Sequence, residues 1–134
     1  MLHEQERIAF HESAHAVVHH YFRHPIDRVE VGEDTGRCVV PAEWYERVSD
    51  NRISALVRRE ALIEQIIACC AGKCAMDRLH GYKALSDDNW RASDDYKQAL
   101  GYARRANDGD LLGALRLIAW CERRAELLVG QQWP

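Results

Sequence analysis

Two histidines four residues apart constrain this chain most, because they lie in a long segment that nothing interrupts. His11 and His15 belong to the sequence His-Glu-Ser-Ala-His, inside a stretch from Glu6 to Phe22 that contains neither proline nor glycine. Such a stretch favours a helix, and side chains four positions apart lie one above the other on a helix. The segment therefore predicts a helix that presents both imidazoles on one face.

The phase of that helix decides where the two imidazoles point. At roughly 100° per residue, the histidines fall in the same arc of roughly 80° as Ile8, Val18 and Phe22, so we expect them to face the protein interior. Two imidazoles placed in this way can share one Zn²⁺ at about 2.0–2.1 Å each. The intervening Glu12 is then near enough to take a proton from a water on the metal. The motif predicts the core of a zinc peptidase, with Glu12 as general base.

A catalytic zinc usually takes three protein ligands, and the residues leave the third one open. The extended metzincin pattern would place glycine at position 18 and histidine at position 21, whereas this chain has Val18 and Tyr21, so that class is excluded. His19 lies about 12 Å along the helix from His11 and cannot join both motif histidines on one metal. It either supports a ligand or flanks the cleft. The acidic candidates on later segments are Glu60, Glu64, Asp94 and Asp95.

Hydrophobic periodicity along the rest of the chain predicts a mainly α, α+β fold with about four helices and a small β-hairpin. Two short alternating runs surround a turn bounded by glycines, which is typical of a hairpin. Three further segments carry apolar residues at helical spacing, and the middle of the first is apolar nearly all round, so we expect it to be central and heavily buried. The expected strands are 26–31 and 37–41, and the expected helices are about 53–80, 93–106 and 110–129.

Local signals also mark where these helices start and stop. Gly81 is a suitable stop for the central helix, and Ser93 can cap the next one, with Asp94 and Asp95 in its first turn. The polar stretch 82–92 is expected to be a loop, and 44–51 a loop or a short helical turn. The whole chain, residues 1–134, is predicted to be one domain.

The composition of the chain limits the classes of binding partner and the location that we expect. The net charge of −3, with acidic and basic residues interspersed, argues against nucleic acid. There is no apolar run of about 20 residues to cross a membrane, and the N-terminus does not resemble a signal peptide. Five cysteines are an odd number, and three of them crowd one predicted helix, so we expect no disulfide framework and a reducing, cytoplasmic location.

Three stretches together resemble the peptidase domain of FtsH-type AAA zinc proteases, over about residues 6–129. That family has a helix of the form A-x-H-E-x-G-H-A, to which residues 9–16 are similar. Its G-R-x-A-E helix compares with residues 72–77, and its A-S-N-D-x-x-x-A-T-x-x-A-R stretch compares with residues 92–104. The resemblance implies an FtsH-peptidase-like fold in which His11, His15 and Asp95 bind Zn²⁺ and Glu12 is the base.

The departures from the family pattern shape the expected function. Ala14 stands where the family has glycine and Met76 where it has glutamate, and no G-x-x-x-x-G-K-[ST] loop is present. We therefore expect a stand-alone relative, ATP-independent on its own, that cleaves peptides or flexible polypeptide segments. An extended substrate would lie along the hairpin. A homo-oligomer and a separate ATPase chain are the protein partners that the resemblance raises.

A second reading keeps the fold and removes the turnover. In it the chain is a catalytically silent, zinc-containing interaction or regulatory module. The intact Glu12 argues against this reading, because a purely structural zinc site has no need of a base at that position.

Overall fold

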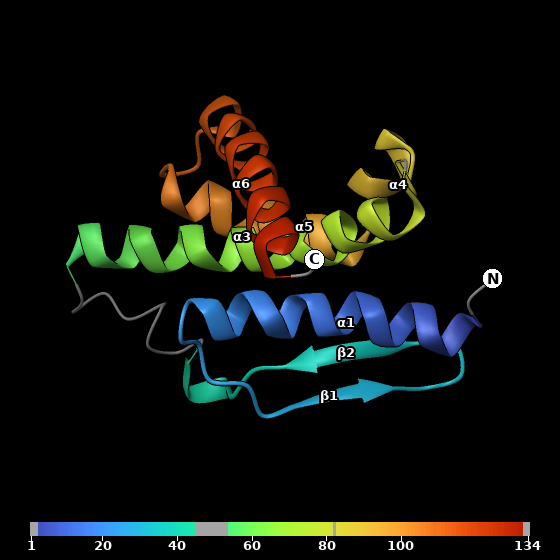
Figure 1. Cartoon of the computed structure of the whole chain (residues 1–134). Coiled ribbons are helices and arrows are strands. Elements are labelled where there is room, and N and C mark those ends of the chain that lie inside the picture. The colour runs from blue at the N-terminus through green and yellow to red at the C-terminus, as the bar shows by residue number, and fades with distance from the viewer. Residues whose placement is uncertain (1–2, 45–53, 82, 133–134) are drawn as a thin grey trace.

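A computed structural model describes residues 3–44, 54–81 and 83–132, and it confirms a mainly helical fold with one small hairpin (Figure 1). None of the helices in these ranges is both long and apolar enough to cross a membrane. The elements are α1 (Glu4–Tyr21), β1 (Arg28–Val31), β2 (Gly36–Val39), α3 (Ala55–His80), α4 (Asp87–Ala92), α5 (Asp94–Ala106) and α6 (Leu111–Gln132).

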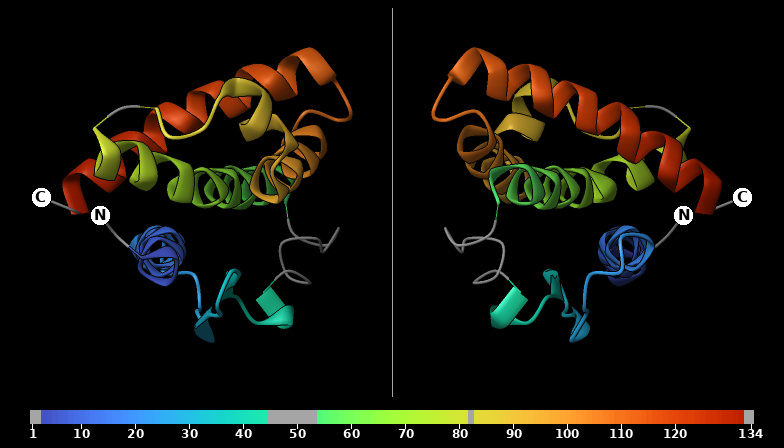
Figure 2. Two further views of the ribbon diagram at one scale, coloured as in Figure 1. Left: turned by 90° about the vertical axis from the view of Figure 1, so that its right-hand side faces the viewer. Right: turned by 90° about the vertical axis from the view of Figure 1, so that its left-hand side faces the viewer.

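The elements stack in layers around α3. The hairpin packs on α1, α1 lies beside α3, and α5 and α6 cover the other side of α3 (Figures 1 and 2). Figure 2 shows α1 end-on, with α3 lying between α1 and α6. Burial agrees with this central position, since α3 contributes the largest run of buried side chains, from Leu62 to Met76. The predicted central helix is therefore confirmed.

Small side chains let the helices approach closely. Ala14 on α1, Ala71 and Ala75 on α3, and Ala99 on α5 are all fully buried. Interaxial distance depends on the side chains at the contact, so small buried residues permit a close approach of the helices. As a consequence, polar groups on α1 and α5 can meet across the face of α3.

The ends of the helices follow the predicted signals, with one correction. Gly81 ends α3 in the left-handed conformation (φ 72°), and the Ser93 hydroxyl caps α5 by accepting from the backbone N–H of Tyr96 at 3.2 Å. The prediction of a loop over 82–92 was wrong at its end, because α4 forms there behind its own cap, Ser86. Its six residues are too few to show helical periodicity, and the buried Trp90 anchors it.

The hairpin is shorter than the two predicted runs. β1 and β2 pair antiparallel, with Val29 opposite Cys38 and Val31 opposite Gly36. Residues 42–44 start a helical turn, and the remainder of the predicted loop at 44–51 lies outside the described residues.

Candidate metal centre

The two motif histidines lie side by side on the face of α1 that packs against α3. His15 is buried, and its Nδ1 lies 2.7 Å from the carbonyl oxygen of Ala68 on α3. A carbonyl oxygen only accepts, so Nδ1 carries a proton, and in the neutral ring Nε2 carries the lone pair. His11 is less buried, and its Nε2 lies 3.1 Å from Nε2 of His15. The expected inward orientation of both rings is confirmed.

The first turn of α5 places Asp95 opposite this pair. Its Oδ2 lies 3.0 Å from Nε2 of His11 and 3.1 Å from Nε2 of His15, although 80 residues separate it from His15. The Ser93 cap fixes the start of α5 and thereby the position of this carboxylate. Nε2 of His11, Nε2 of His15 and Oδ2 of Asp95 can each donate an electron pair to a metal ion. These three atoms, from two helices, form a triangle with sides of 3.0–3.1 Å, the donor triangle.

The other acidic candidates for a third ligand form no hydrogen bond with His11 or His15 among the described residues. Glu64 Oε2 lies 3.3 Å from Nε2 of His24. Glu60 and Asp94 are exposed. Among the four carboxylates that the sequence left open, Asp95 is the one within hydrogen-bond distance of both motif histidines.

The donor set fits a cation at the centre of the triangle. The lone pair on Nε2 of His15 faces a carboxylate oxygen of Asp95, so two acceptors oppose each other unless a proton or a metal ion lies between them. Three ligands at about 2.0–2.1 Å from a tetrahedral zinc are separated by roughly 3.3 Å, within a few tenths of the observed sides. His11, Glu12 and His15 also offer ligand atoms that lie within 4.8 Å of one another, so this cluster can hold a metal ion.

Gly72 on α3 provides the space for this cluster. A Cβ added there would lie 2.4 Å from Cε1 and 2.5 Å from Nε2 of His11, and 2.7 Å from Nε2 of His15. Real Cβ atoms essentially never come this close to other heavy atoms. The absence of a side chain at this position therefore allows both imidazoles to turn toward Asp95.

Gly36, at the start of β2, plays the same part for the candidate base. A Cβ there would lie 2.3 Å from Cγ2 of Ile8 and 3.0 Å from Cγ of Glu12. The hairpin can therefore lie directly over Glu12, whose side chain is 12% exposed and whose Oε1 is 3.9 Å from Nε2 of His11. Glu12 is close to the donor triangle without belonging to it.

Protonation of the cluster follows from its electrostatics. Burial raises the pKa of Asp95, but hydrogen bonds to His11 and His15 outweigh it and hold that pKa well below the usual range. Burial lowers the pKa of His15, and the hydrogen bond and charge of Asp95 outweigh it, so the pKa of this imidazole is raised. The carboxylate is thus ionised, as a metal ligand must be.

A second group of histidines continues from the same helix. His19 Nδ1 lies 2.9 Å from Nδ1 of His24, and both rings are buried. His19 was expected to support a ligand or to flank the cleft, whereas His24 was not expected near it, because the return of His24 toward α1 depends on the chain reversal at Arg23, which has a positive φ of 61°. Among the described residues, His19 forms no hydrogen bond with His11 or His15, so it flanks the centre.

Two cavities flank the candidate centre and share Glu12 and Gly36 in their walls. One, of about 220 Å³, also contains His15, Gln65 and Asp95; the other, of about 210 Å³, also contains His11, Thr35 and Met76. The donor triangle therefore lies between two hollows, with Glu12 at their common wall. An extended peptide that crosses the candidate metal centre could occupy both cavities.

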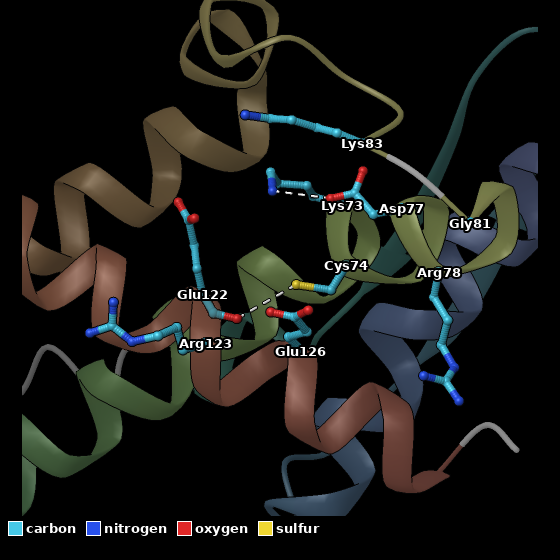
Figure 3. A pocket seen from close by; sticks show the side chains of 9 residues that line it. All are labelled: Lys73, Cys74, Asp77, Arg78, Gly81, Lys83, Glu122, Arg123 and Glu126. Carbon is cyan, nitrogen blue, oxygen red and sulfur yellow. Dashed lines mark hydrogen bonds and ion pairs between the residues drawn. The ribbon is translucent and has the colours of Figure 1, made fainter.

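A larger cavity of about 640 Å³ lies on the opposite side of α3, against α6 (Figure 3). Its wall contains charges of both signs that compensate one another, for example Lys73 and Asp77 at 3.2 Å. Burial raises the pKa of Cys74 there to about 12, which keeps its thiol protonated and unreactive. Size alone does not make it the site of chemistry.

Comparison of the chain with models of known protein families, with curated proteins and with solved structures found no match. The functional interpretation therefore depends on the residues of this site and their geometry.

Proposed function

We propose that the chain is a zinc-dependent endopeptidase that hydrolyses peptide bonds in peptides or flexible polypeptide segments. The observation that carries the proposal is the position of Glu12, next to a triangle of two imidazoles and a carboxylate and in the common wall of two cavities. Two histidines and one carboxylate are a common ligand set of catalytic zinc, which keeps a fourth position for water or substrate.

In this proposal His11, His15 and Asp95 are the ligands. Zinc, when bound, supplies Lewis acidity that polarises the scissile carbonyl and makes a water molecule more acidic. Glu12 would act as the base that takes a proton from the attacking water and would return it to the leaving amine. The carbonyl of Ala68 holds the ring of His15 in the tautomer and orientation that ligation needs.

The expected substrates are peptides and unfolded segments, because the sequence contains no motif of an ATPase that could unfold a folded protein. The chain has no phosphate-binding loop for ATP, so by itself it would act on segments that are already unfolded, without ATP. Val29 and Val31 on β1 are partly exposed, and this strand could pair with an extended substrate. In this proposal, assembly into a homo-oligomer or with a separate ATPase chain would allow the enzyme to act on folded substrates as well. The likeness to FtsH-type peptidases is part of the same proposal.

The proposal is tested by separating metal binding from turnover. Zinc content and cleavage of an unstructured protein would be measured for the parent protein, for Glu12→Gln and for Asp95→Ala. We expect Glu12→Gln to keep its zinc and to lose at least about a hundredfold in rate, the range of general acid–base contributions. Asp95→Ala should lose both, because a ligand is removed.

Two outcomes would contradict parts of the proposal. Undiminished zinc affinity in Asp95→Ala would show that another residue is the third ligand. A zinc-loaded parent protein that cleaves no flexible substrate would favour the silent interaction module in place of the enzyme.

A further inference from the structure

Gln65 is a buried amide without a partner in the wall of the 220 Å³ cavity beside the candidate metal centre. The residue lies on α3 and is 2% exposed, and its Nε2 has no hydrogen-bond partner among the described residues. Buried polar groups are almost always hydrogen-bonded, so each exception calls for an explanation. A ligand that accepts a hydrogen bond inside this cavity would supply the missing partner.

His19 faces the same cavity with a nitrogen of the opposite hydrogen-bonding type. The carboxylate of Glu64 only accepts, so Nε2 of His24 carries a proton and donates to it at 3.3 Å. Nδ1 of His24 is then an acceptor, and it receives the Nδ1 proton of His19 at 2.9 Å. The other nitrogen of His19, Nε2, therefore keeps its lone pair, and His19 is one of the residues that line the cavity.

Both rings stay neutral, which keeps this arrangement intact. Burial, together with the nearby His24 and His15, lowers the pKa of His19 to about 3. Burial also lowers the pKa of His24, and Glu64 offsets only part of that effect. His19 is thus an acceptor of hydrogen bonds at neutral pH.

We propose that His19 and Gln65 form a specificity pocket for the carboxamide side chain of an asparagine or glutamine next to the scissile bond. The N–H of the carboxamide would donate to Nε2 of His19, and its oxygen would accept from Nε2 of Gln65. This assignment rests on the proposed endopeptidase function and adds the class of residue that the enzyme selects.

The chemistry of the pocket rejects the alternatives. A carboxylate side chain offers no donor to His19, an ammonium offers no acceptor to Gln65, and an aliphatic side chain offers neither. The cavity of about 220 Å³ holds roughly seven waters at about 30 Å³ each, which is ample for a carboxamide side chain.

Binding of labelled peptides would test this pocket without depending on turnover. The protein is the zinc-loaded Glu12→Gln variant, and the probes are fluorescein-labelled Gly/Ser peptides that carry one central Gln, Leu, Glu or Lys. Fluorescence anisotropy should show about tenfold tighter binding of the Gln peptide, the size expected for hydrogen bonds to neutral groups. Adding Gln65→Leu should reduce the Gln peptide to the level of the Leu peptide.

Gln98→Leu is the matched control, because Gln98 lines the same cavity but is exposed. It should keep the preference. Gln65→Leu replaces an unpartnered buried amide by an apolar side chain of similar size, so the variant should melt no lower than its parent, and Gln65→Met gives a second test of the same position. Mapping of cleavage sites in a disordered protein by the parent enzyme should show Gln and Asn enriched at one position beside the cleaved bond.

The outcomes separate this proposal from the endopeptidase proposal. Equal affinity for the Gln and Leu peptides, no measurable binding of the Gln peptide, or a preference that survives Gln65→Leu would overturn the specificity pocket. A parent protein that binds the Gln peptide selectively but cleaves nothing would overturn the endopeptidase function and leave the pocket standing.

Discussion

Replacing Gly72 by alanine tests whether the centre depends on the close approach of α3 to α1. The added methyl would lie 2.5 Å from Nε2 of His11 and 2.7 Å from Nε2 of His15, whereas ordinary contact begins at 3.4 Å. Both imidazole nitrogens would therefore have to move by roughly 0.7–0.9 Å, several times the tolerance of about 0.2 Å that a metal site allows.

The expected result is a large loss of metal affinity with a moderate loss of stability. Moving two ligands by this much should weaken zinc binding at least about a hundredfold, the upper end for disturbing the support of a ligand alone. Inserting one methyl into a packed interface typically costs about 1–3 kcal/mol of unfolding free energy. The variant should thus fold but bind zinc poorly.

Competition with a chromophoric zinc chelator measures the affinity, and urea unfolding of the zinc-free protein measures the stability. Gly101→Ala on α5 is the matched control, since a Cβ there meets nothing within 4 Å. It should leave zinc affinity unchanged and raise stability by about 0.5–1 kcal/mol, the helical preference of alanine over glycine. Parent-like zinc affinity in Gly72→Ala would refute the reasoning, because the ligands would then not occupy the space that this glycine leaves.

Three further predictions concern the cap, the metal and the buried histidine. Ser93→Ala should cost about 1 kcal/mol and also weaken zinc binding, because its cap positions Asp95, whereas Ser86→Ala should cost a similar amount without touching zinc affinity; equal zinc affinities in the two variants would contradict this role. Chelation of zinc should lower the melting temperature, since a metal at 100 times its dissociation constant stabilises by about 2.7 kcal/mol, and an unchanged melting curve in EDTA would count against a metal that joins α1 and α5. The pKa of His19 is lowered in the folded protein from 6.5 to about 3, so between these pH values the unfolded chain binds a proton at His19 and the folded chain does not. Stability present above pH 6.5 is then lost as the pH falls toward 3, by at most about 1.4 kcal/mol per pH unit; urea unfolding of the zinc-free protein should show a shallower pH slope in His19→Gln, and identical slopes would disprove the assignment.

Local sequence determined the elements that carry the centre. The uninterrupted segment around His11 and His15 could only be a helix with both rings on its buried face, because spacing and phase are properties of a few neighbouring residues. The cap at Ser93 likewise sets the first turn of α5, where Asp94 and Asp95 were both candidates, and the resemblance to the FtsH-type peptidases singled out Asp95. Only the six-residue α4 escaped, because a helix so short has no periodicity to detect.

Tertiary structure decided which of these candidates meet. Helical spacing and capping do not distinguish Asp95 from Glu64 as the partner of the histidines, whereas the packing of α5 and α1 on α3 brings Asp95 to them. The same packing leaves no room for a Cβ at Gly72, and it leaves Nε2 of Gln65 without a partner. Close contacts between distant segments depend on differences of a few tenths of an ångström in the separation of their backbones. A one-dimensional pattern of residue types does not specify that separation.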